Sequence, residues 1–275
     1  MNEREFSVGT VALEYRDGVA VDTADKQVST IRADQDAIRV GHAADTTGSS
    51  LAGQELIGQP GIRSAKDLRG KTIAVDSTDM QAALILKKML LASGLKPNRD
   101  YQLKVVGANR LKAMRDNKEY AAAMLAGAQA ALAKQQGFVS LGNSLDVVGP
   151  VAYHGVFVRR SWARENADVL SRYIAAEIEA QRWILLPANK EKVVAFILKS
   201  SPDGTTAAMA DDIYREMVTG PGELTKDIRL QVPALENFLR LRAEVEGSWK
   251  GSPPPAASLY DPSYYQKALD LVSQH

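Results

Sequence analysis

The chain has 275 residues, a length that suits one large domain or two modest ones. Hydrophobic residues make up 45% of it and charged residues 24%, an ordinary balance for a globular protein. With 34 Lys and Arg against 33 Asp and Glu, the formal net charge is only +1, and no apolar run reaches the roughly 18–20 residues that span a bilayer. We therefore expect neither a nucleic-acid partner nor a membrane-spanning segment.

Cysteine is absent, which excludes disulfides, thiolate metal sites and cysteine nucleophiles. Of the three histidines, His275 is terminal, so only His42 and His154 are candidate ligands or bases. The first residues, MNEREFSVGTVALEY, lack the basic, apolar and small-residue order of a secretory signal. We expect a periplasmic or lipid-anchored protein if a signal sequence is missing here, and a cytoplasmic one otherwise.

The first 60 residues are predicted to form short strands at 6–15, 18–21 and 37–41, separated by a polar segment without a clear period. The third strand leads into residues 42–50, HAADTTGSS, a turn of small polar residues. Such a turn either binds a ligand or satisfies loop backbone groups. The sequence GQPG at 58–61 predicts a further turn and a candidate domain boundary.

Residues 71–95, KTIAVDSTDMQAALILKKMLLASGL, form the most informative stretch. Thr72–Val75 is short, β-branched and apolar, as an interior parallel strand should be. Thr78 and Gln81 fit a capping box that starts a helix, and Gly94 suits the left-handed position that ends one. One face of this helix is apolar, with Ala82, Ile85, Leu86 and Met89. A strand that feeds a helix N-terminus is where open α/β folds bind ligands, although every strand–helix unit shares this pattern.

The remaining elements follow from periodicity and from Gly and Pro breaks. Strands are predicted at 103–106 and 152–159, and helices at 64–68, 110–117, 127–136, 168–186, 190–199, 206–218, 233–245 and 263–272. Periodicity does not decide whether Ala121–Leu125 is a strand or the start of a helix. The helix at 168–186 is expected to bury Leu170, Ile174, Ile178 and Leu185.

Alternating strands and helices, followed by a helix-rich third, predict an α/β fold with mostly parallel sheet. Turn-rich breaks near 58–63 and 149–151 enclose one α/β block. We therefore predict two lobes, with residues 1–63 and 151–275 in lobe one and residues 64–150 in an inserted lobe two.

Residues 55–95, ELIGQPGIRSAKDLRGKTIAVDSTDMQAALILKKMLLASGL, resemble the periplasmic substrate-binding proteins of ABC importers in the nitrate/sulfonate/taurine (SsuA/NMT1-like) and thiamine-precursor-like group. The most specific part is IRSAKDLRGKTIAV at 62–75. The resemblance continues through RLKAMRDNKEYAAAML (110–125), KQQGF (134–138), VFVRRSWARENADVLSRYIAA (156–176) and SLYDPSYYQKAL (258–269). It covers about residues 38–275. The 37 residues before it do not match, so we expect an abbreviated or divergent N-terminal part.

The resemblance implies a two-lobed, periplasmic-binding-protein-like (type II) fold of mixed, mostly parallel sheets flanked by helices. Its lobes would close over a small-molecule ligand and deliver it to an ABC permease. The family pattern places two turns, the end of one strand and one histidine around the cleft. The implied ligand-binding residues are His42, Asp45, Thr46, Thr47, Asp76, Ser77, Thr78, Asp79, Met80, Leu125, Ala126 and His154. Where the family often has a proline or aromatic contact after Leu125, this chain has Ala126-Gly127-Ala128.

Asp76 and Asp79 bear on the charge of the ligand. Two like charges about 4 Å apart cost on the order of 4 kcal/mol at an effective dielectric of 20. That exceeds the roughly 0.3–1 kcal/mol by which a helix N-terminus stabilises a carboxylate. We therefore predict a neutral, zwitterionic or amine-bearing ligand rather than a simple oxyanion, unless Asp79 faces solvent as an ordinary first-turn residue.

The sequence contains no Ser/His/Asp order, metal-ligand cluster, GxGxxG or P-loop, so we expect neither catalysis nor a cofactor or metal. Two alternatives stay open. One is an intracellular enzyme on the same fold, decarboxylase- or pyrimidine-synthase-like, with His42, Asp45, Asp76 or His154 as acid or base. The other is a truncated, weakly binding paralogue. The chemistry of the cysteine-dependent desulfinase that shares this fold is excluded by the absence of cysteine.

Overall fold

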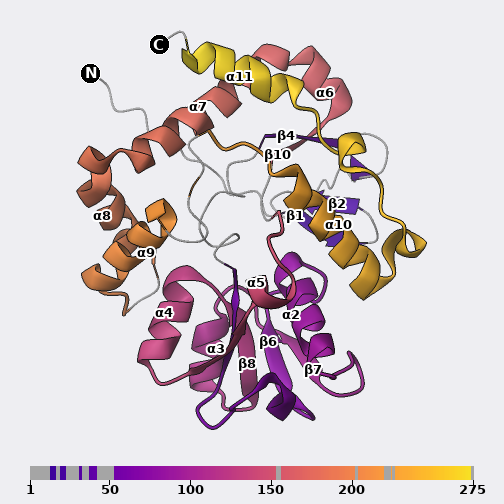
Figure 1. The fold of residues 1–275 in the computed structure, drawn as a ribbon, viewed down its shortest axis with the longest axis vertical. Coiled ribbons are helices and arrows are strands. Elements are labelled where there is room, and N and C mark those ends of the chain that lie inside the picture. Colours follow the sequence, from indigo (N-terminus) through magenta and orange to yellow (C-terminus); the bar gives the residue numbers. More distant parts are fainter. Residues whose placement is uncertain are drawn as a thin grey trace.

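A five-stranded sheet organises residues 53–152, in the lower half of Figure 1. The computed structural model describes residues 53–152, 156–201, 204–219, 224 and 227–273, and the backbone of four short strands between 13 and 41. The strand order is β7-β6-β8-β5-β9. The strands are β5 (Glu55–Gly58), β6 (Thr72–Val75), β7 (Gln102–Val105), β8 (Tyr120–Leu125) and β9 (Val139–Asn143).

The sheet is mixed. β6 runs parallel to β7 and β8, whereas β5 runs antiparallel to β8 and β9, so four of the five strands point the same way. β8 pairs with a strand on each side, which settles that the small apolar run at 121–125 is a strand. The central strands β6 and β8 are almost wholly buried, while the edge strands β7 and β9 are largely exposed. This is the burial pattern of a sheet covered on both faces.

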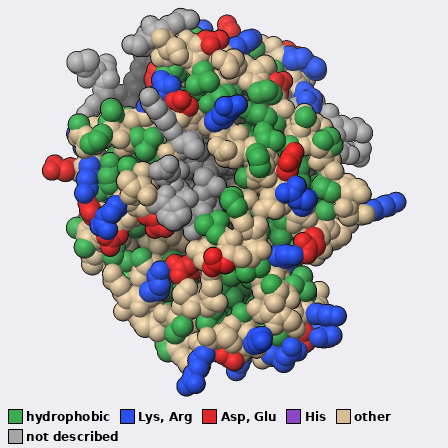
Figure 2. Space-filling model, viewed as in Figure 1, with side chains coloured by type: hydrophobic (Ala, Val, Ile, Leu, Met, Phe, Trp, Pro, Cys, Tyr) green, Lys and Arg blue, Asp and Glu red, His purple; other side chains and the backbone are tan. Residues whose placement is uncertain are grey.

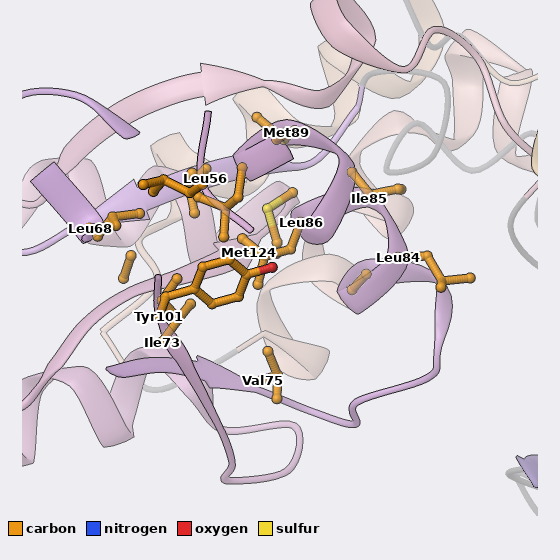
Figure 3. Close-up of a cluster of buried hydrophobic side chains, with 14 of the residues drawn as sticks. Leu56, Leu68, Ile73, Val75, Leu84, Ile85, Leu86, Met89, Tyr101 and Met124 are labelled. Carbon is orange, nitrogen blue, oxygen red and sulfur yellow. The ribbon is translucent and has the colours of Figure 1, made fainter. Parts of the chain in front are cut away.

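Side chains alternate between the two faces of the sheet, as the pleat requires. Leu56, Ile73 and Met124 join one buried cluster with α2 (Gln81–Ala92), shown in Figure 3. The residues next to them, such as Ile57 and Ala74, join a second cluster with α3 (Arg110–Asp116) and α4 (Gly127–Gln135). The two short helices of this part are η1 (Ala65–Leu68) and α5 (Ser144–Val147).

The predicted α2 is confirmed at its C-terminus and wrong at its start. Gly94 has φ +81°, its N–H bonds Leu91 O, and the Leu95 N–H bonds Leu90 O at 2.9 Å, which is a Schellman cap. The predicted capping box of Thr78 with Gln81 does not form, because Met80 is the N-cap residue and helix α2 begins at Gln81. The Gln81 side chain is instead directed to the carbonyl of Ala152.

The upper half of Figure 1 is mainly helical. Its helices are α6 (Arg160–Glu165), α7 (Ala167–Leu185), η2 (Pro187–Asn189), α8 (Lys190–Ser200), α9 (Ala207–Thr219), α10 (Val232–Glu246), η3 (Ser248–Gly251), η4 (Ala256–Ser258) and α11 (Ser263–Ser273). Strand β10 (Val156–Arg159) pairs antiparallel with β4 (Ala37–Gly41). The strands β1 (Leu13–Arg16), β2 (Val19–Asp22) and β3 (Ile31–Arg32) form a third, antiparallel sheet.

Helix α7 packs against α11 through a buried cluster that includes Leu170, Ile174 and Ile178, as predicted. The prediction for Leu185 is wrong, because this residue at the end of the helix is only partly buried. Within the described part of the chain, no helix is both long enough and apolar enough to cross a bilayer.

Helix α10 belongs to two cores. Leu241 is buried in the cluster of α2 and the sheet, whereas Leu235 and Leu239 pack with Ala152. The Asn237 amide donates to the carbonyls of Val148 and Pro150, both at 2.8 Å, where the chain leaves the sheet. Helix α10 therefore contacts both the core of the sheet and the segment by which the chain leaves the sheet.

Several predicted boundaries need correction. Strands β5, β9 and β3 were not predicted, and of the strand expected at 6–15 the described residues contain only the end, in β1. Of the strand predicted at 152–159, the described residues show β10 at Val156–Arg159 and Ala152 outside it, while 153–155 lie outside the described part of the chain. Two elements outside residues 64–150 contact this region, since β5 is a strand of its sheet and Leu241 of α10 lies in its core. The division into lobes stays a prediction.

Asp100 holds together the loop between α2 and β7. Its side chain is 6% exposed and accepts hydrogen bonds from Arg99, from the Lys96 N–H at 2.8 Å and from Arg69 at 2.5 Å. The bond from Arg99, with that from the Lys96 N–H, lowers the pKa of Asp100 to about 2.

On the face shown in Figure 2, basic and acidic side chains are interspersed, except at the lower end, where Lys and Arg predominate.

Leu86→Ala should lower the free energy of unfolding by about 3 kcal/mol, because it leaves a cavity in the core of α2 and the sheet. Leu86 is 0% exposed, whereas Val105, at the end of edge strand β7, is 53% exposed. The control Val105→Ala should therefore change little. Urea denaturation of both variants measures the difference, and equal losses would contradict the assignment of this core.

Asp100→Asn should destabilise the fold in a pH-dependent way. The pKa of Asp100 is lowered from 3.8 to about 2, so its ionised form stabilises the folded state fully above pH 4. The stabilisation is lost as the pH falls towards 2. The difference in Tm between the natural chain and Asp100→Asn should be largest near neutral pH and shrink between pH 4 and pH 2. A difference that is constant over this range would contradict the ion-pair assignment.

Candidate functional site

The carboxyl edge of the five-stranded sheet carries the side chains that sequence reasoning singled out. Asp76 follows β6 directly, and its carboxylate forms an ion pair with Arg110, the first residue of α3, at 2.9 Å. The Arg110 Nε also donates to the carbonyl of Met124 in β8, at 2.9 Å. Both charged side chains are mostly buried, at 14% and 21% exposure. Arg110 therefore ties together the ends of two neighbouring parallel strands.

The turn after Asp76 is held by short-range hydrogen bonds. The Ser77 N–H donates to the Asp76 carboxylate at 2.9 Å, and the Ser77 hydroxyl donates to the Asp79 carboxylate. The carbonyl of Thr78 accepts from the Lys87 ammonium at 2.7 Å. These hydrogen bonds stabilise the turn. Met80, at the end of the turn, is 42% exposed.

Helices α2 and α4 both begin at this edge without a side-chain cap. Their N-cap residues are Met80 and Ala126, which have no oxygen in the side chain to accept from the first-turn N–H groups. The first turn of a helix has N–H groups with no partner inside the helix, and the macrodipole makes them favourable to oxygen acceptors. Among the described residues, no side chain caps the first-turn N–H groups of these two helices at the ends of β6 and β8.

Gln81, the first residue of α2, adds an acceptor to these donors. Its side chain is 9% exposed, and its Nε2 donates to the carbonyl of Ala152 at 3.1 Å. Its Oε1 is buried and, among the described residues, is one of three side-chain atoms without a hydrogen-bond partner. A buried amide oxygen left unpaired costs roughly 1–3 kcal/mol. It is therefore suited to accept from an N–H or O–H group of a bound molecule.

A contact from the C-terminal third reaches the same turn. Arg242 of α10 donates to the carbonyl of Asp79 at 3.2 Å and also pairs with Glu246 at 2.8 Å. Lys88 of α2 forms an ion pair with Glu244 of α10. The turn at 76–80 is therefore connected to α10 as well as to the sheet.

The expectation that two aspartates repel an anion is changed by this geometry. Arg110 offsets the charge of Asp76, since an attraction of about 4 kcal/mol at a separation of about 4 Å and an effective dielectric of 20 matches the repulsion expected from the carboxylate. Asp79 remains, with its carboxylate hydrogen-bonded by Ser77. The two carboxylates therefore do not act as two free negative charges.

The predicted site residues fall into three groups. Asp76, Ser77, Thr78, Asp79 and Met80 lie together in one turn, and Ala126 begins α4 at the same edge. Leu125 is 1% exposed, and its side chain packs in the cluster with α3 and α4. The third group lies outside the described part of the chain and contains His42, Asp45, Thr46, Thr47 and His154.

Sequence reasoning missed Arg110, Gln81 and Arg242 as site residues. The predicted capping box already explains a polar residue at position 81, so the sequence alone does not mark Gln81 as a site residue. Arg110 could have been suspected, because it opens a helix directly after a strand, where a basic residue is unfavourable to the macrodipole. Within the described part of the chain, no cluster of three or more His, Asp or Glu side chains is arranged to hold a metal ion.

Comparison with known proteins identifies similar folds. A family model with the description "NMT1-like family" matches residues 21–198, and so begins upstream of residue 38, where the resemblance was expected to start. None of the curated proteins compared with the chain matches it.

Solved structures are similar at low sequence identity. The putative sulfonate-binding protein SsuA of Methylobacillus flagellatus KT has 16% identity and a TM-score of 0.61, over 86% of this chain and 70% of that one. The nitrate-binding protein NrtA of Synechocystis PCC 6803 has 13% identity and a TM-score of 0.61, over 81% and 66%. The desulfurization enzyme DSZB has 15% identity and a TM-score of 0.59, over 88% and 81%. These likenesses show the fold.

Arg110→Met should lower the free energy of unfolding by about 2 kcal/mol, between the values for a surface ion pair and a buried one. The change leaves Asp76 without its counter-charge and Met124 O without its donor. Asp76→Asn in the same chain should recover part of the loss, because the uncompensated charge is then removed. Urea denaturation measures both effects, with Arg115→Met on the exposed face of α3 as the control.

Proposed function

The chain belongs to the NMT1-like family, and from this premise we propose that it is the solute-binding component of an ABC-type importer. It has the fold of type II periplasmic binding proteins. Two of the similar structures are described as periplasmic binding proteins for a sulfonate and for nitrate. The proposal is that this chain binds a small organic molecule in the periplasm and delivers it to a permease.

The observation that carries the proposal is the set of unpaired groups at one edge of the sheet. The first turns of α2 and α4 offer N–H donors, and the Gln81 Oε1 beside them offers a buried acceptor. A molecule that carries both an oxygen acceptor and an N–H or O–H donor would satisfy both kinds of group. We therefore propose a zwitterionic or amide-bearing ligand, which agrees with the neutral, zwitterionic or amine-bearing class predicted from the sequence.

The proposed mechanism is closure of two lobes around this ligand. We infer that lobe two contains the five-stranded sheet with α2 to α5, and that the chain leaves it near residues 149–151. Gly149 has φ +74°, and Asn237 of α10 binds the carbonyls on either side of it. These hydrogen bonds and the one from Gln81 to Ala152 support a hinge where the chain leaves lobe two.

An enzyme on the same fold is the alternative, and the likeness to the desulfurization enzyme DSZB supports it weakly. Of its candidate acid–base residues, Asp76 lies in the described part of the chain. The ion pair with Arg110 favours a structural role for this carboxylate over proton transfer. The geometry of the described residues therefore supports binding better than catalysis.

A thermal-shift screen over a metabolite library tests the proposal. A ligand at a hundred times its Kd stabilises the fold by about 2.7 kcal/mol, so a true ligand raises Tm in a saturable way. We expect the strongest shifts from zwitterionic and amide-bearing compounds. Gln81→Leu should weaken binding of the best compound roughly tenfold, because the ligand loses one buried hydrogen-bond partner.

The matched control is Gln102→Leu, which changes an exposed glutamine on edge strand β7. It should leave the affinity unchanged. A correctly folded chain that no compound stabilises would contradict a binding function. Tight binding that Gln81→Leu does not weaken would place the ligand elsewhere.

A further inference from the structure

Helix α7 carries apolar residues on two faces, and among the described elements α11 packs on one of them. Its inner face packs on α11, which lies beside it in Figure 1, through Leu170, Ile174 and Ile178. On its outer face, five exposed apolar residues recur along the helix: Val169, Tyr173, Ala176, Ala180 and Trp183. Val169 is 59% exposed, Tyr173 47% and Trp183 43%.

The spacing of this outer stripe is that of a helix–helix seam. The intervals are four, three, four and three residues, which is the alternation of the a and d positions in a heptad. The exposed residues of a lone surface helix are normally polar. The stripe runs for about 21 Å along α7, at 1.5 Å per residue. Leu186, 53% exposed, continues it at the end of the helix.

Opposite charges flank the stripe at equivalent heptad positions. Arg172 and Glu179 each stand one residue before an a position, on the exposed side of the helix. Neither takes part in an ion pair within the described part of the chain. In an antiparallel pair of identical helices, residues at this flanking position face each other across the seam.

We propose that this face binds a second copy of the same chain, with the two α7 helices antiparallel and the two-fold axis between Tyr173 and Ala176. In this register Arg172 of each copy faces Glu179 of the other, so two ion pairs form. Tyr173 packs against Ala176, and Val169 against Ala180, a large residue against a small one at each level. The inference is independent of the ligand-binding function.

The next possible register is disfavoured by the same residues. Moving the axis by half a heptad places Glu179 against Glu179 and Ala176 against Ala180. Like charges then meet at the flank, and two small residues leave a gap at the seam. Charge and side-chain volume therefore select the same register.

A single helix pair buries less than the about 800 Å² per partner of a standard interface, so we expect a weak dimer that forms at high protein concentration. Phe196 of α8, which is 70% exposed and follows the stripe in the chain, is available to enlarge the contact.

Cysteine pairing tests the register directly, because the natural chain contains no cysteine. When Val169→Cys and Ala180→Cys proteins are mixed and mildly oxidised, a disulfide should link one of each. Neither variant should form a disulfide-linked dimer alone, since residues 169 of the two copies lie far apart in an antiparallel pair. The control is Ala208→Cys, at an exposed alanine of α9.

A link between Val169→Cys copies alone would indicate parallel helices, and a link between Ala176→Cys and Ala180→Cys would indicate the other register. Either result would overturn the proposal. So would equal cross-linking of Ala208→Cys.

Charge exchange tests the same contact without new thiols. Arg172→Glu or Glu179→Arg alone should raise the dimer dissociation constant roughly tenfold, because each places like charges together twice. The double variant should restore the natural value, while Arg164→Glu on α6 should change nothing. Sedimentation equilibrium measures the constants. A chain that stays monomeric at every concentration would overturn the proposal.

Discussion

The ion pair between Asp76 and Arg110 is the interaction on which the candidate site depends. Asp76 follows the last residue of β6, and Arg110 is the first residue of α3. The Arg110 side chain also donates to the carbonyl of Met124, near the end of β8. One guanidinium thus sets the distance between the ends of two strands, from which α2 and α4 begin. It also offsets the negative charge of Asp76, one of the two carboxylates that would otherwise repel oxygen acceptors from the N-termini of these helices.

The same edge is joined to distant parts of the chain. Gln81 reaches the carbonyl of Ala152, and Arg242 of α10 reaches the carbonyl of Asp79. Since α10 also contributes Leu241 to the core of the sheet, a movement of the segment at 149–152 would change contacts at the site. Under the proposed closure around a ligand, such contacts would connect α10 to the movement of the two lobes.

The sequence predicts most helices and the central strand β6, but leaves β8 open between strand and helix, because Gly and Pro breaks and apolar periodicity are local signals. Thr72–Val75 and the Gly94 cap are examples. It does not reveal β5 (Glu55–Gly58) or β9 (Val139–Asn143), since both are short and become strands by long-range pairing, β5 with β8 and β9 with β5. It placed the turn at 76–80 in the site, but not Arg110 or Gln81, whose partners lie 34 and 71 residues away along the chain.

Hydrogen exchange of the first-turn amides tests the central claim most directly, with the compound that gives the largest thermal shift as the ligand. The account predicts slower exchange at residues 81–83 of α2 and 127–129 of α4 in the saturated protein. Exchange in α11 (Ser263–Ser273), which packs on α7, should not change. Saturable binding without protection at either first turn would contradict the claim that these two helices hold the ligand.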